Sequence, residues 1–136
     1  MKVRLQTFSF RFAEQVLNSK FTTKQEIEAI LNDKTIDLSK MSRPAFNEKL
    51  DQLFVMKGWE RQPSVFAETS DPAAKMDFLK ERVGIEVEFG HSSFIGIDLL
   101  KFQVASYSGL DKIDIGVYVV TTKEFQKAMK NEFKQN

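Results

Sequence analysis

The chain has 136 residues, a net charge of +1, no cysteine and a single histidine, His91. This length fits one domain with a substantial core. The lack of cysteine excludes disulfides and thiolate metal sites, and one histidine excludes a zinc site built from several histidines. No apolar run approaches the roughly 18 residues that span a bilayer, and no signal-peptide pattern is present. The composition therefore favours a cytoplasmic globular protein without a membrane partner.

The first third of the chain is predicted to be mainly helical. Lys2 to Phe12 is compatible with a short edge strand. Thr23-Lys24-Gln25-Glu26 has the form of a capping box, in which the Thr and Glu side chains accept hydrogen bonds from free amides at a helix start. The helix that follows carries an apolar stripe and ends near Asn32. The stripe consists of Ile27, Ile30 and Leu31.

A second helix is predicted from Ser42, with Pro44 in its first turn and Gly58 at its end. Trp59 is expected to pack against the end of this helix. The apolar positions repeat at helical spacing and are Phe46, Leu50, Leu53 and Phe54.

Two interpretations are open for the chain around Asp77. Ser64 to Thr69 is compatible with a short strand, and Ser70-Asp71-Pro72 is a break after it. The residues after this break have the composition of a helix start, which would place Asp77 in a helix. The alternative places Asp77 on extended chain just before a turn.

The stretch from Val83 to Phe89 alternates as a β-strand, with Val83 and every second residue on one face and Glu86 and Glu88 on the other. A third acid, Asp77, lies upstream. Carboxylates that lie together repel one another and are costly to desolvate, so such a group often needs a cation. Carboxylate oxygens suit Mg2+, which keeps several waters for a phosphate substrate. The alternative is a solvated strand face, with Lys80 and Arg82 as salt-bridge partners.

The remainder of the chain predicts a helix, a strand and a last helix. Apolar positions from Leu99 to Tyr107 fit a helix that Gly109 ends, and Lys112 to Val120 fits a strand. Thr121 to Glu124 has the form of another capping box. Strands separated by helices imply crossover connections, so we expect an α/β fold with a mixed central sheet flanked by helices.

Part of the chain resembles the type II restriction endonucleases of the BglII and BstYI kind, which belong to the PD-(D/E)XK nuclease superfamily. The likeness begins with Asp77 to Gly90, which includes Val83-Gly84-Ile85-Glu86-Val87-Glu88-Phe89. It continues through Ser93-Phe94 and Asp98-Leu99 and especially Asp111-Lys112-Ile113-Asp114-Ile115-Gly116-Val117. Weaker likeness covers Asn47 to Leu50 and Lys57 to Trp59. The resemblance implies a restriction-endonuclease-like core and the extended placement of Asp77. It also implies a single nuclease-like domain over residues 1–136, without the C-terminal segment of the relatives.

The resemblance further implies a catalytic set of three acids and Mg2+ as the cofactor. Asp77 and Glu86 would be metal ligands, with the backbone carbonyl of Val87 completing the inner sphere. Glu88 lies where the superfamily usually has Lys and where these relatives have Gln. A glutamate there is similar to the BamHI variant of the motif, in which it serves as a general base or holds a second metal ion.

Residues near the acids are candidates for binding double-stranded DNA. His91 and Ser92 follow the acidic strand, where the relatives place side chains against base edges, and a solvated turn is the alternative. Lys80, like Arg82 and Lys101, is a candidate for phosphate contacts, although most surface lysines make none. Gln62, shortly after Trp59, lies where a relative has an amide side chain that helps the active site, so the resemblance makes it a candidate for that role. Asp114 is expected to bridge Lys112 or Arg82.

Together these observations predict a Mg2+-dependent, sequence-specific double-strand DNA endonuclease, with a palindromic site that has a GATC core as candidate. A palindrome is most simply read by a homodimer. The apolar stripes from Phe46 to Phe54 and from Leu100 to Tyr107 are candidate interfaces, with monomer core as the alternative for each.

The alternative function is a nuclease-fold domain that binds DNA or a partner without cleavage. A protein-interaction domain unrelated to nucleic acid is a third possibility, which the balanced net charge leaves open.

Overall fold

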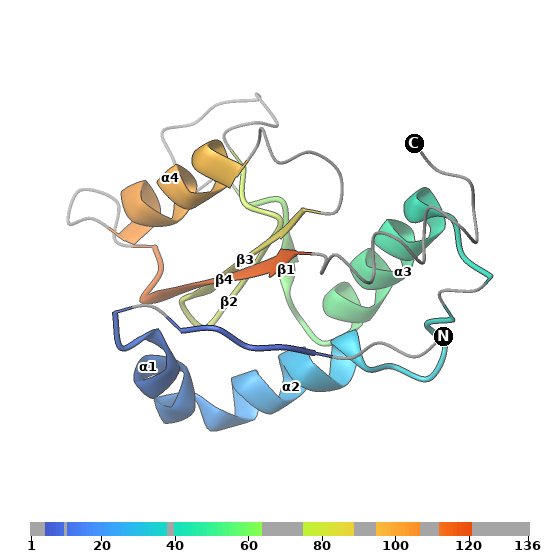
Figure 1. Cartoon of the computed structure of the whole chain (residues 1–136), viewed down its shortest axis with the longest axis horizontal. Helices are drawn as coiled ribbons and strands as arrows, with labels where there is room; N and C mark the ends of the chain where they lie inside the picture. Colours follow the sequence, from blue (N-terminus) through green and yellow to red (C-terminus); the bar gives the residue numbers. More distant parts are fainter. Residues whose placement is uncertain are drawn as a thin grey trace. The chain divides into compact units, whose positions relative to one another are not determined.

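The computed structural model describes residues 5–9, 11–37, 40–63, 75–88, 95–106 and 112–120. By their contacts these residues fall into two compact units (Figure 1). One contains the helical chain up to Leu53, and the other runs from Phe54 to Val120 and contains a sheet and one helix packed on it. The single domain expected over residues 1–136 stays a prediction.

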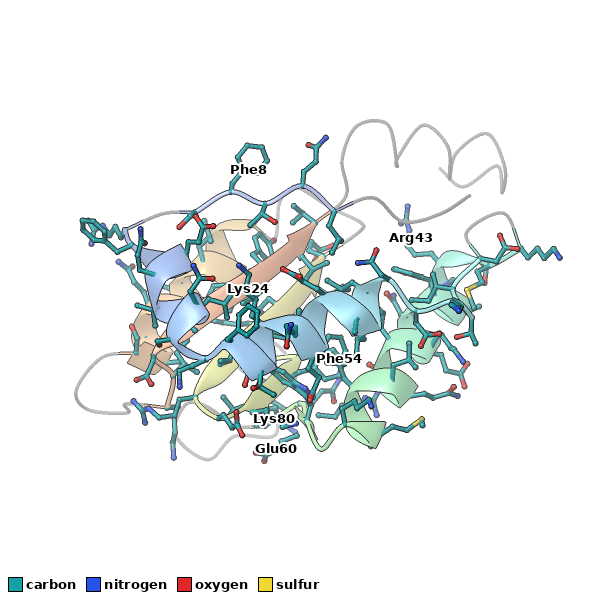
Figure 2. The ribbon with its side chains drawn as sticks, turned by 90° about the horizontal axis from the view of Figure 1, so that it is seen from below. Phe8, Lys24, Arg43, Phe54, Glu60 and Lys80 are labelled. Carbon is teal, nitrogen blue, oxygen red and sulfur yellow. The ribbon has the colours of Figure 1, made fainter. Side chains whose placement is uncertain are left out.

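The first unit begins with two consecutive helices, α1 (Ala13–Ser19) and α2 (Phe21–Leu31). The edge strand expected over Lys2 to Phe12 is wrong for its described part, because residues 5–9 form neither helix nor strand and Phe12 lies in a turn with a φ of 60°. Phe8 in this stretch is 91% exposed and projects away from the ribbon (Figure 2).

The start of α2 also differs from the prediction. The helix begins two residues before Thr23, which lies inside it and is only 4% exposed, so Thr23 is not the N-cap residue. The physical reason is that α1 leads almost directly into α2, and the backbone carbonyl of Lys20 accepts the hydrogen bond from the amide of Lys24. The predicted buried stripe and the end of the helix before Asn32 are confirmed. The stripe residues Ile27, Ile30 and Leu31 are all buried.

Helix α3 (Arg43–Met56) follows the prediction closely. The Ser42 hydroxyl accepts a hydrogen bond from the amide of Ala45 at 3.2 Å, and Pro44 lies in the first turn, where its missing amide costs nothing. Gly58 ends the helical segment with a φ of 85°, a conformation that favours glycine. The stripe is core rather than a free surface, since Phe46, Leu50 and Phe54 are at most 3% exposed.

Phe54 opens the second unit and connects the end of α3 to the sheet. Its ring stacks on Phe78 with 4.4 Å between centroids, and Trp59 meets it edge to face at 5.4 Å. This confirms the expected packing of Trp59 against the end of the helix.

Four strands of the second unit form one mixed sheet in the order β1-β2-β3-β4. The neighbours from β1 to β3 are antiparallel, whereas β3 and β4 are parallel and are connected through helix α4 (Ile95–Ser106). The expected α/β fold with a mixed sheet is confirmed. Asp77 directly precedes β2 and is not helical, so the extended interpretation is correct. The strands are β1 (Glu60–Arg61), β2 (Phe78–Lys80), β3 (Val83–Glu88) and β4 (Ile115–Val120).

A two-residue turn joins β2 to β3. Glu81 and Arg82 both have positive φ, 49° and 64°, which is the geometry that fits the twist of a tight hairpin. The turn is tied to the chain before β4, because Arg82 Nε donates to Asp114 Oδ1 at 2.9 Å and the Asp114 amide donates to the Arg82 carbonyl at 2.8 Å. Of the two partners expected for Asp114, the structure thus identifies Arg82.

Helix α4 lies close against one face of β3 and β4 because two glycines lie beneath it (Figure 1). Gly84 and Gly116 are register partners on the parallel strands. A Cβ on Gly116 would lie 2.5 Å from the Phe102 ring, and a Cβ on Gly84 would collide with the sulfur of Met76. The cluster that fills this space comprises Met76, Leu79, Phe102, Ala105 and Ile113.

The buried face of α4 differs in part from the prediction. Leu99 and Leu100, which were expected among its apolar positions, are 51% and 58% exposed, whereas Phe102 from the same set packs against the core cluster. The inward face also carries Asp98, which is 5% exposed, and Lys101, whose side chain is 11% exposed. Phe102 and Ala105 fix the rotation of the helix over the glycines, and helical spacing then turns Asp98 and Lys101 to the same face.

Several predicted features lie outside the described residues: the strand at Ser64 to Thr69, the end of the helix at Tyr107 and Gly109, and the last helix from Thr121. Within the described chain, no helix combines the length and the apolar character needed to cross a membrane.

Candidate active site

The structure brings Asp77 and Glu86 together across the β2–β3 hairpin. The Val87 amide donates a hydrogen bond of 2.7 Å to Asp77 Oδ2, and the Asp77 carbonyl accepts one of 2.8 Å from the amide of Gln62. The acid is therefore held from two sides. Gln62 itself has a φ of 52°, an uncommon conformation for a residue other than glycine. The backbone of Gln62, rather than its amide side chain, is what the structure connects to Asp77.

Glu86 is a buried acid on the central strand β3. It is 3% exposed although it was expected on the polar face of its strand, because β3 lies between two strands and α4 covers that face. Burial, and then the nearby charge of Asp77, raise the pKa of Glu86 from 4.5 to about 8, against the opposing effect of Lys101. Its buried Oε1 atom has no hydrogen-bond partner among the described residues. A buried oxygen without a hydrogen bond is costly in free energy, so this position needs an explanation.

Lys101 approaches the same acid from α4. Its ammonium nitrogen lies 3.6 Å from Glu86 Oε1 and 3.7 Å from Asp98 Oδ1. It also donates a hydrogen bond of 3.1 Å to the carbonyl of Lys75, two residues before Asp77. The distance to Glu86 is that of an ion pair without a direct hydrogen bond, which reconciles the charge contact with the unpartnered oxygen.

Tyr118 on β4 completes the group. It is the register partner of Glu86, and its hydroxyl donates a hydrogen bond of 2.7 Å to Asp98 Oδ2. Its ring also meets Phe102 edge to face at 6.2 Å. Burial and the surrounding acids raise the pKa of Tyr118, so it stays a hydrogen-bond donor at neutral pH.

These atoms fit a hard divalent cation. Within the described residues no three acid or histidine side chains form a ready metal cage. Mg2+, however, commonly uses one or two carboxylates and completes its shell with water and substrate phosphate. Asp77 and the unpartnered oxygen of Glu86 supply two carboxylates. The Val87 amide points toward Asp77, and in a strand the carbonyl of a residue points to the same side as its amide.

The other predicted site residues have different outcomes. Glu88 is half-buried at the end of β3, on the same strand face as Glu86, and its charge acts on Tyr118. Lys80 donates a hydrogen bond of 2.6 Å to the carbonyl of Lys57; it lies on β2, beside the strand that carries Glu60 (Figure 2). His91 and Ser92 lie outside the described residues.

Sequence reasoning gave Asp98 no role beyond the family resemblance, did not single out Tyr118, and treated Lys101 as a surface lysine that could contact phosphate. Asp98 and Lys101 show the spacing of an ordinary exposed ion pair on a helix. One indication in the sequence was the apolar pair Leu99 and Leu100 between Asp98 and Lys101. Apolar residues lie on more than one face of this helix, so the sequence alone does not decide which face is buried. Only the packing of Phe102 over Gly116 decides which face turns inward.

A comparison with protein families gives one match. The family model described as restriction endonuclease BglII/BglIII covers residues 5–135. No curated protein matches the chain. The match includes every strand of the sheet, α4 and both acids that the hairpin brings together.

Proposed function

The chain belongs to the BglII/BglIII restriction endonuclease family, and on that premise we propose that its acidic centre cleaves double-stranded DNA with Mg2+ as cofactor. Membership makes the chain a type II site-specific deoxyribonuclease and makes DNA its substrate. The observation that carries the proposed mechanism is Glu86, a buried acid with an oxygen that accepts no hydrogen bond from the described residues, beside a second acid, Asp77. A divalent cation could be coordinated by that oxygen, and its charge would offset the repulsion between the two carboxylates.

Asp77, Glu86 and the Val87 carbonyl are the proposed metal ligands. When bound, Mg2+ supplies charge stabilisation for the phosphate and lowers the pKa of a water molecule. The hydrogen bond from the Val87 amide orients Asp77, and the sheet position of Glu86 fixes the second carboxylate without a flexible loop. Both acids are therefore arranged before substrate arrives, which favours catalysis by electrostatic preorganisation.

Glu88 is the proposed general base, or the residue that orients the attacking water. It is half-buried, two residues beyond Glu86 on the same strand face, so it lies beside the metal ligands rather than among them. A carboxylate in this position accepts a proton from water as the phosphodiester is attacked.

The DNA contacts are proposed on the same basis. Lys80 on β2 is a candidate for a phosphate contact, and His91 and Ser92 are candidates for reading base edges just after β3. A homodimer that reads a palindrome, with a GATC core as the first candidate, lets each subunit cut one strand.

The direct test is incubation of the purified protein with a plasmid rich in GATC sites, once with Mg2+ and once with EDTA. Discrete fragments with Mg2+ alone would support the proposal, and sequencing their ends would give the recognition site. A Glu60→Gln variant is a suitable control, because Glu60 is an exposed acid on β1. Uncut plasmid, together with duplex binding in Ca2+, would instead indicate a nuclease fold that binds DNA without cleavage.

A further inference from the structure

The positive charge in the acidic centre comes from the helix and not from the strand that carries the acids. Strand β3 carries Glu86 and Glu88, and Asp77 precedes β2, so these three positions provide no cation. The ammonium group that the structure places against Glu86 comes from α4, through Lys101. It is largely shielded from water, with 11% of the side chain exposed, so its charge acts on its neighbours with little screening.

Lys101 is held by groups on three different segments. Glu86 lies on β3, Asp98 lies one helical turn away on α4, and the Lys75 carbonyl belongs to the chain that leads to Asp77. Asp98 is in turn fixed by the Tyr118 hydroxyl. The ammonium therefore has a second carboxylate within 3.7 Å that does not depend on Glu86.

We propose that Lys101 is a positioning residue that acts as an internal counter-ion, occupying the free side of Glu86 until a divalent metal ion replaces it. Asp98 retains the displaced ammonium within the site. Lys101 thereby keeps the two acid-bearing segments assembled without metal and lowers the affinity for metal. The inference rests on the proposed function, because it assumes that Glu86 is a metal ligand.

The direction of the effect follows from Coulomb's law. An ammonium a few ångströms from a bound divalent cation opposes its binding, and because Lys101 is largely shielded from water this repulsion is screened little. Removing the charge of Lys101 should therefore tighten metal binding. Removing the charge of Asp98 should weaken metal binding, because the ammonium then has only Glu86 as its carboxylate partner.

Calorimetric titration with Mn2+ in the absence of DNA tests this inference. We expect Lys101→Met to lower the Kd at least about tenfold, whereas Lys101→Arg, which keeps the charge, should stay within about threefold of the wild type. Lys112→Met, which removes an exposed lysine, is the matched control and should leave the Kd unchanged. Unchanged or weaker binding by Lys101→Met would overturn the inference.

Asp98→Asn gives an independent arm that keeps an acceptor for Tyr118. We expect it to raise the Kd several-fold, opposite in sign to Lys101→Met. If Lys101→Met does not fold, this variant decides: equal or tighter binding by Asp98→Asn contradicts the inference. If the predicted shifts occur but the wild type cuts no plasmid, the counter-ion role stands and the proposed function fails. If the wild type binds no Mn2+, both fail.

Discussion

The sheet face beneath α4 has two halves that differ in chemistry although they are adjacent in register. At Gly84 and Gly116 the helix closes over an apolar cluster with tight contacts. At Glu86 and Tyr118, the next residues on the same face, it brings a lysine and an acid against a buried carboxylate with an unpartnered oxygen. The packing of the apolar half determines where α4 lies on the sheet, and this position brings Asp98 and Lys101 of the helix to the polar half. Natural folds tolerate such locally unfavourable groups mainly at functional sites.

The largest expected effect concerns the polar half. Asp77→Asn should reduce Mg2+-dependent cleavage by about 10³-fold or more, because it removes a proposed metal ligand. The asparagine oxygen can still accept the Val87 amide, so the far-ultraviolet circular dichroism should not change. Undiminished cleavage would remove Asp77 from the mechanism.

Glu88→Gln should slow cleavage by about 10²-fold, the usual size for loss of a general base. Single-turnover rates at saturating Mg2+ would measure this effect separately from DNA binding. Retained or improved activity would show that a glutamine, as in the relatives, works equally well in this position.

Glu86 should make stability depend on pH. Its pKa is raised from 4.5 to about 8, so the folded state binds the proton more tightly than the unfolded chain does. The stability of the metal-free protein should therefore fall as pH rises between these values and level off above the upper one. In EDTA, Glu86→Gln should be more stable than the wild type by about 2–4 kcal/mol at high pH, with little difference in acid. Urea unfolding at both extremes measures this, and an equal difference at both would contradict the account.

The apolar half is tested by Gly116→Ala. The added Cβ would meet the Phe102 ring at 2.5 Å, and an aromatic ring cannot move aside as easily as the end of a methionine. We expect a loss of about 1–3 kcal/mol in the free energy of unfolding. Because the helix must shift, cleavage should fall too. Gly84→Ala meets the flexible Met76 and should cost less; the reverse order would be inconsistent with this packing.

The smallest effect lies away from this face. Asp114→Asn removes the ion pair with Arg82, in which both side chains are at least 40% exposed. Such pairs contribute about 0–1 kcal/mol, so thermal unfolding should change little and cleavage should not change. A large loss of cleavage would mean that the β2–β3 turn contributes to the site.

The sequence predicted two of the four strands. The alternation in Val83 to Phe89 and in Lys112 to Val120 indicated β3 and β4, because strand periodicity is local, although β4 begins only at Ile115. The short strands β1 and β2 were not predicted. The stop at Gly58 was equally local. The capping box predicted at Thr23 was wrong, because the preceding helix α1 determines where α2 begins. The inward positions of Asp98 and Lys101 on α4 depend on the tertiary packing of Phe102 over Gly116, which no local pattern contains.

The same distinction applies to the site. Asp77 and Glu86 were found through family resemblance and their order along the chain, and the structure brings them together. Lys101 was underestimated because an ammonium on an amphipathic helix normally faces water. Its role became visible only when the helix was placed on the sheet.

The central claim is that the unpartnered oxygen of Glu86 is a metal ligand. Calorimetric titration of Mg2+ into the wild type and into Glu86→Gln, at neutral pH and without DNA, tests it most directly. The account predicts saturable binding by the wild type and at least about tenfold weaker binding by the variant, since metal binding displaces the proton of Glu86 and leaves a charged ligand, which a neutral amide cannot provide. Equal binding by the two proteins, or no binding by the wild type, would contradict it.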